Sequence, residues 1–220
     1  MKGTLQMKKA GTLILCALLA FFPALPALSE IESRRVASVG NFTITEDMVR
    51  LFCLQDEAAK VIADMYGLGP SIIDKTGIDT QTAERQLQTA CAAAQAALDA
   101  GISVSVDTVK EMIDQELVNY PSSQGQEYFG EYARYVSGRF GGDLDGLIST
   151  AVPLRRIELL AAEYLSLAVN GRLKNKTDEE SAQLLAEELK AVPCARGDGA
   201  ACEPSNEWLL ENIFLLRGIR

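Results

Sequence analysis

Residues 34–46 read RRVASVGNFTITE. The spaced valines, the Gly40-Asn41 turn and the run from Phe42 to Ile44 predict a short strand, a tight turn and a second extended piece. Thr43 and Glu46 have the spacing of a capping box, so a helix is expected to begin at this point. A hairpin that leads directly into a helix is therefore the first structural unit of the chain.

Helical patterns dominate the sequence that follows. Apolar residues recur at helical spacing up to Gly67, from Asp79 or Thr80 to Gly101, from Ser105 or Asp107 to Pro121, and from Gln124 to about Arg139. The second of these segments is rich in alanine between residues 90 and 100, which favours a helix and lets a neighbouring helix approach closely. These patterns predict a mostly α fold with a minimal β-sheet.

The C-terminal part of the chain is predicted to continue in the same way. One or two turns near Leu144 precede a long helix that has Pro153 in its first turn and ends at Asn170-Gly171. Thr177 begins a capping box that opens a helix to about Ala191, and Ser205 caps a short helix that contains Trp208. Residues 213–219, IFLLRGI, are predicted to form a final strand.

The N-terminus has the pattern of a secretory signal peptide. Lys2, Lys8 and Lys9 precede an apolar segment from Ala10 to Phe22, and small residues before Glu30 suit cleavage there. The apolar segment is shorter than the roughly 20 residues that a membrane-spanning helix needs, although an uncleaved anchor is the alternative. We therefore expect residues 1–29 to be removed, and the mature protein to be periplasmic or secreted without a stable membrane span.

Composition excludes several classes of function. Without residues 1–29, 18 basic residues face 30 acidic ones, a formal charge of about −12, which argues against nucleic acid as a partner. The chain contains no histidine, which excludes Ser-His-Asp and Cys-His catalysis and every histidine metal site. The acidic groups at Asp143 and Asp145 and at 178–180 lack the spacing of a calcium loop. We expect no metal, no cofactor and no enzymatic activity.

Four cysteines remain after cleavage, namely Cys53, Cys91, Cys194 and Cys202. An even number in an exported chain indicates two disulfides, for which three pairings are possible. Cys194 and Cys202 flank a glycine-containing turn that would close easily, so the favoured pairing is 53–91 together with 194–202.

The order of these elements resembles the N-terminal core of SurA-type periplasmic chaperones and peptidyl-prolyl isomerases. The segments that carry the resemblance are the hairpin and cap at 36–46, the alanine-rich helix with Gly101-Ile102-Ser103-Val104-Ser105, Phe140-Gly141-Gly142 followed by the basic start at 155–156, and Trp208-Leu209 with 213–219. They span about residues 34–172 and 205–220.

The resemblance implies a division into residues 1–29, a SurA-like helical domain at 30–172, and a C-terminal helix, disulfide loop and closing helix-strand at 173–220. It also implies that the last strand, near 213–219, pairs with the first, near 34–39. Only residues 174–205 separate the long helix from the closing element, so the isomerase (parvulin-type) domain of the family, on the order of 100 residues, is absent. The chain is therefore expected to lack isomerase activity.

The resemblance predicts an ATP-independent chaperone-like protein that binds unfolded or extended polypeptides in the bacterial cell envelope. The predicted lining of its binding groove consists of aromatic and apolar side chains, which give large and adaptable contacts: Met112, Leu117, Tyr128, Phe129, Tyr132 and Tyr135. The same residues could instead form the core between helices. The alternative function is a dedicated partner-binding or assembly subunit of an envelope complex.

Overall fold

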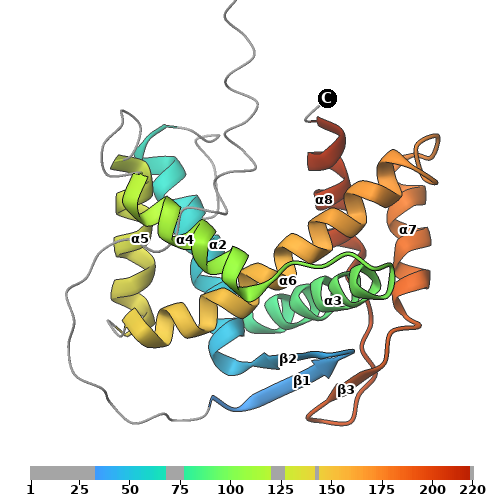
Figure 1. The fold of residues 1–220 in the computed structure, drawn as a ribbon, viewed down its shortest axis with the longest axis horizontal. Helices are drawn as coiled ribbons and strands as arrows, with labels where there is room; N and C mark the ends of the chain where they lie inside the picture. Colours follow the sequence, from blue (N-terminus) through green and yellow to red (C-terminus); the bar gives the residue numbers. More distant parts are fainter. Residues whose placement is uncertain (1–32, 68–76, 120–126, 142–143, 219–220) are drawn as a thin grey trace, which may run out of the picture.

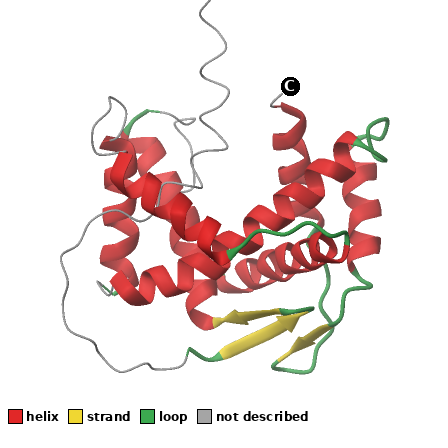
Figure 2. Cartoon of the chain, viewed as in Figure 1, coloured by secondary structure: helices red, strands yellow, loops and turns green. Residues whose placement is uncertain are grey.

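The computed structural model describes residues 33–67, 77–119, 127–141 and 144–218. Within these ranges the chain forms seven helices and three short strands, which confirms the mostly α fold class (Figure 2). The predicted signal peptide, residues 1–29, lies outside the described residues.

The sheet is small and antiparallel. Strand β1 (Arg35–Val39) lies between β2 (Phe42–Thr45) and β3 (Cys194–Arg196). The predicted hairpin of β1 and β2 is confirmed, and its turn needs glycine at position 40, where φ is +54°. A Cβ atom there would also lie 2.5 Å from the side chain of Gln95, so any other residue would displace that glutamine.

The third strand is not the one that the sequence predicted. Cys194 to Arg196 pair with β1 in the register Val39 to Cys194 and Ala37 to Arg196. The chain instead ends as helix α8 (Asn206–Gly218), whose C-terminal end lies across the molecule from the sheet (Figure 1). The predicted pairing of 34–39 with 213–219 is therefore wrong, and the part of the family resemblance that rested on a closing strand is lost with it.

Contacts at both ends explain why residues 213–218 continue a helix. Ser205 caps α8 as predicted, since its hydroxyl oxygen accepts a hydrogen bond from the Trp208 amide at 3.2 Å. In the last turn, the Arg217 guanidinium forms an ion pair with Asp178 and donates to the Leu173 carbonyl and the Ser181 hydroxyl. A cation at a helix C-terminus is favourable in itself, and here it also joins α8 to the preceding helix.

Two helices form the base of the molecule. Helix α3 (Thr80–Asp99) is capped by Asp79 and buries most of its alanines, and helix α6 (Leu144–Asn170) packs along it. Helix α6 is one continuous helix from Leu144, whereas the sequence predicted a separate turn and a start near Pro153. Pro153 is tolerated inside the helix because it lies on the exposed side, where water can solvate the carbonyl that loses its partner.

The remaining helices stand on either side of this base (Figure 1). Helices α2 (Glu46–Met65), α4 (Val106–Asn119) and α5 (Glu127–Phe140) lie on one side, and α7 (Asp178–Leu189) and α8 lie on the other. The N-cap of α2 is Thr45 rather than the predicted Thr43, because Thr45 Oγ1 accepts from the Met48 amide. The predicted capping box at Thr177 and Glu180 is confirmed.

The C-terminal segment shares one hydrophobic core with the rest of the described chain. Leu185 and Leu189 of α7 and Leu209 and Ile213 of α8 belong to the same buried cluster as the residues of the sheet and of α3. Residues 173–218 therefore share their core with the preceding helices and the sheet.

Candidate functional site

The predicted groove residues on α5 are engaged in packing against α2. Tyr132 is only 2% exposed, and its hydroxyl donates to the Gln55 carbonyl at 3.2 Å. For Tyr132 the structure thus agrees with the alternative that these residues form the core between helices.

Tyr135 is half-buried and takes part in a polar cluster. Its hydroxyl donates to Glu57 Oε1 at 2.6 Å, and the Arg139 guanidinium lies 2.5 Å from the same oxygen and 4.5 Å from the centre of the Tyr135 ring. Burial, followed by the hydrogen bond and the charge of Glu57, raises the pKa of Tyr135. The cluster ties α5 to α2 and leaves the Tyr135 hydroxyl occupied.

The other four predicted residues do not extend this pair into a described groove. Met112 on α4 is half-buried. The side chains of Leu117, Tyr128 and Phe129 lie outside the described residues. The prediction of a client-binding groove at these six positions therefore stays a prediction.

Large apolar side chains are exposed elsewhere, at the C-terminal ends of α2 and α8. The most exposed there are Phe214 at 67%, Met65 at 64% and Leu215 at 57%, and Tyr66 is also exposed; Leu167 on α6, at 56%, is the next most exposed in the described chain. We call the four residues at the ends of α2 and α8 the apolar rim, which has two separate parts because these ends lie on either side of the base (Figure 1). Sequence analysis missed it because residues 213–219 were interpreted as a strand. In helical register, Phe214 falls opposite the buried Trp208, Leu209 and Ile213, and this register would have indicated its exposure.

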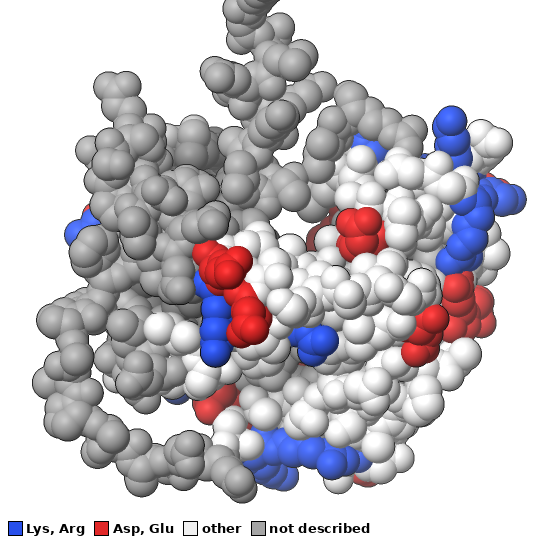
Figure 3. All heavy atoms as spheres, viewed as in Figure 1, with Lys and Arg blue, Asp and Glu red and all other residues white. Residues whose placement is uncertain are grey.

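Charged residues of α2 and α8 face each other below this rim. Burial raises the pKa of Glu211 on α8, and the negative charges of Glu207 and of Asp56 on α2 raise it further. Lys60 of α2, whose ammonium lies 2.7 Å from Asp56, opposes this effect. The two helices are thus close enough to interact electrostatically. On the face shown in Figure 3, uncharged side chains predominate in the middle of the described surface, with a few charged groups among them.

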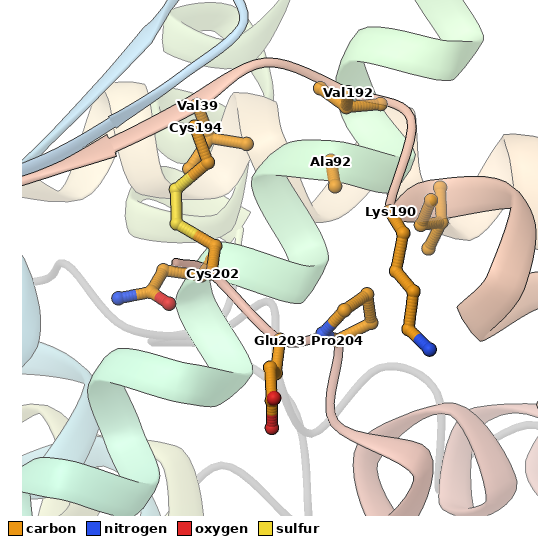
Figure 4. Close-up of a pocket in the computed structure, with 10 residues that line it drawn as sticks. Val39, Ala92, Lys190, Val192, Cys194, Cys202, Glu203 and Pro204 are labelled. Atoms are coloured by element: carbon orange, nitrogen blue, oxygen red, sulfur yellow. A yellow bond between two sulfur atoms is a disulfide. The ribbon is translucent and has the colours of Figure 1, made fainter. Parts of the chain in front are cut away.

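A second feature is a small hollow beside the disulfide that joins Cys194 and Cys202 (Figure 4). Apolar side chains make up most of its wall, and Lys190 and Glu203 lie at its edge. It has room of about 20 Å³, little more than one water molecule occupies. Small-molecule sites measure roughly 300 to 1,000 Å³, so this hollow is not one.

Gln88 of α3 lines the hollow and is 3% exposed. Neither its Oε1 nor its Nε2 atom has a hydrogen-bond partner in the described part of the chain. A buried polar atom without a partner costs about 1 to 3 kcal/mol, so this amide is an unfavourable feature of the fold. Nothing in the sequence distinguishes Gln88 from the other glutamines of α3, and it was not predicted.

The disulfide pairing is partly as predicted. Cys194 and Cys202 are bonded, but Cys53 and Cys91 are free thiols, which corrects the favoured 53–91 pairing. Cys53, on α2, lies near the start of α3, since its carbonyl is beside Gly77 and, after burial, the charges of Asp56 and Asp79 help to raise its pKa. Cys91 is eleven residues into α3, about 16 Å along the axis at 1.5 Å per residue, and burial raises its pKa to about 12.

The described residues meet the requirements of neither a three-ligand metal site nor a membrane-spanning helix. They contain no group of three or more histidine, cysteine, aspartate or glutamate side chains placed to hold a metal ion. In the same ranges, no helix is both long enough and apolar enough to cross a membrane. No protein-family model, curated protein or solved structure matches this chain.

Proposed function

We propose that the protein binds unfolded or extended segments of other polypeptides at the apolar rim, as an ATP-independent chaperone-like protein. The observation that carries the proposal is the exposure of Phe214 and Leu215, adjacent in the last turns of α8. Exposed apolar side chains at neighbouring positions are a recurrent feature of protein-binding surfaces. Phenylalanine, leucine and methionine also fit client segments of varied sequence, because their contacts are large and undirected.

The charges beneath the rim fit the same function. Asp56, Glu207 and Glu211 would discourage two copies of this acidic chain from joining through their rims. An unfolded client with basic or neutral segments would meet no such repulsion. Electrostatics would therefore select partners and favour client binding over self-association.

We further propose that this activity takes place outside the cytoplasm, in the bacterial cell envelope. The signal-peptide pattern of residues 1–29 and the disulfide between Cys194 and Cys202 support export, because disulfides persist in oxidising compartments. The resemblance of residues 34–172 to SurA-type chaperones supports the same assignment, although the closing strand of that family is replaced by α8.

The test is binding of the mature protein, residues 30–220, to a panel of unrelated unfolded polypeptides, together with suppression of their aggregation. We expect binding to several clients, weakened at least tenfold by the double substitution Phe214→Ser and Leu215→Ser, because each side chain contributes about 1.5 to 3 kcal/mol when buried. Leu184→Ser is the matched control, since Leu184 is 46% exposed on α7 and outside the rim.

Three other outcomes would count against the proposal. Binding to no client would overturn it, and unchanged binding by the double variant would remove the rim as the site. Binding of a single natural protein and of no unfolded client would instead identify an assembly subunit of an envelope complex.

A further inference from the structure

We propose that the loop closed by Cys194 and Cys202 covers a second binding point, at Gln88, for the main chain of an extended polypeptide, and that the disulfide holds this cover shut. The proposal concerns the hollow of Figure 4 and not the apolar rim. It rests on the unsatisfied amide of Gln88 and on the way in which the loop is attached.

Gln95 shows what a buried glutamine on this side of α3 does when it has a partner. It is seven residues, or about two turns, after Gln88, and it is similarly buried. Its Oε1 accepts from the main-chain amide of Asn41 at 2.9 Å, and its Nε2 donates to Asp99 at 2.8 Å. Gln88 has the same pair of groups, one donor and one acceptor, with nothing to bind.

An extended polypeptide offers the groups that Gln88 lacks. In a β-conformation, the N–H and C=O of one residue point to the same side, which is how antiparallel strands exchange two hydrogen bonds. Gln88 Oε1 would accept from that N–H and Nε2 would donate to that C=O. Because main-chain groups are common to all residues, such binding would tolerate many sequences.

Cys194 at one end of the loop and Cys202 to Pro204 at the other line the hollow, and these ends must move for the contact to form, because the Gln88 amide is buried. The segment 195–201 is almost entirely exposed, so few apolar contacts hold it in place. Its attachments are the disulfide, the short strand β3, and the hydrogen bond from the Gly197 amide to the Val36 carbonyl at 2.9 Å. The flanking residues are held by the bond from the Gly40 amide to the Pro193 carbonyl at 2.8 Å and by the bond from the Ser205 amide to Thr89 Oγ1 at 2.7 Å.

Reduction removes the covalent attachment. A dithiol transfers two electrons and two protons to Cys194 and Cys202 and becomes a disulfide itself. The freed loop gains conformational freedom and uncovers Gln88 together with the apolar wall formed by Val39, Ala92 and Val192.

The experiment observes the side-chain amide signals of Gln88 by NMR in the oxidised and the dithiol-reduced mature protein. The probes are N-acetylglycine N-methylamide, which carries the required N–H and C=O, and N-acetylsarcosine N-methylamide, which lacks that N–H. We expect the Gln88 signals to shift with the glycine probe in the reduced protein only, and with the sarcosine probe in neither state. Unmoved signals in the reduced, folded protein, or equal shifts with both probes, would overturn the proposal.

A second measurement guards against loss of folding on reduction. Reduced wild type should bind an unfolded polypeptide about tenfold more tightly than reduced Gln88→Met, whereas Gln86→Met, the matched buried glutamine on α3, should bind like wild type. Circular dichroism would verify that all three remain helical. Equal affinity of wild type and Gln88→Met would overturn the inference, and rim-dependent binding by the oxidised protein would still support the proposed function.

Discussion

The main-chain amide of Ser205 donates a 2.7 Å hydrogen bond to Oγ1 of Thr89, 116 positions earlier in the chain. Both residues are buried, and the bond fixes the end of the disulfide loop and the start of α8 on the central helix α3. Thr89 Oγ1 in turn donates to the Arg85 carbonyl at 2.8 Å, so one hydroxyl serves two backbone groups.

Replacing this hydroxyl should destabilise the fold. Thr89→Val keeps the shape of the side chain but leaves the Ser205 amide buried without a partner, and we expect the free energy of unfolding to fall by about 1 to 3 kcal/mol. Thr89→Ser retains the hydroxyl and is the control. Urea unfolding of both variants tests this, and equal stabilities would show that the bond contributes nothing.

Two buried glutamines of α3, Gln88 and Gln95, should respond to the same substitution in opposite directions. Gln88→Met removes two unpartnered polar atoms, so we expect stability to increase by about 1 kcal/mol. Gln95→Met removes the bonds to Asn41 and Asp99 and should lower stability by about 1 to 3 kcal/mol. Thermal and urea unfolding of the pair are the measurements, and a destabilised Gln88→Met variant would mean that its amide is already satisfied.

The tyrosines of α5 should affect stability and leave polypeptide binding alone. Tyr132→Phe and Tyr135→Phe delete the hydroxyls that bond to Gln55 and Glu57, and each should lower the free energy of unfolding by about 1 kcal/mol. Because these rings pack between helices, affinity for unfolded clients should stay within twofold of wild type. A large loss of affinity without loss of stability would return the binding site to α5.

The buried carboxyl of Glu158 predicts a dependence of stability on pH. Burial raises its pKa, while Arg155 at 3.2 Å lowers it by a smaller amount. A carboxyl whose pKa is higher in the folded state is protonated more readily there. It therefore reduces stability as pH rises from the unfolded-state pKa through the raised folded-state pKa.

Glu158→Gln should remove this dependence. The variant and wild type should be similarly stable at about pH 4, and the variant should become the more stable of the two as pH approaches neutrality. Urea unfolding between these pH values measures the difference. A variant that loses stability relative to wild type as pH rises would show that the ion pair with Arg155 outweighs burial.

Local signals in the sequence located the helices well. Asp79, Thr177 and Ser205 each cap the helix that their position predicted, because capping depends on a few neighbouring residues. The prediction of a strand at 213–219 is wrong because the conformation of this segment does not depend on neighbouring residues alone. Its state is set by contacts between distant residues, such as Arg217 with Asp178, which no local pattern contains.

The binding features were harder to predict than the fold. The sequence left open whether Tyr132 lines a groove or the core, because its partner, the Gln55 carbonyl, is 77 positions away. Gln88 is unusual only because Cys194 and Cys202 to Pro204 pack around it, and their position depends on β3 and on Pro193. Such features arise from tertiary packing, so they become visible only once the helices are placed.

The position of β3 has a consequence for the order in which the protein matures. Strand β1 borders β3, yet their pairing partners, such as Ala37 and Arg196, are 159 positions apart in the chain. A polypeptide that emerges from a ribosome exposes its N-terminus first, so one edge of β1 stays unpaired until residues 194–196 have emerged. The sheet is therefore completed late, after the segments that form α2 to α7 have already emerged.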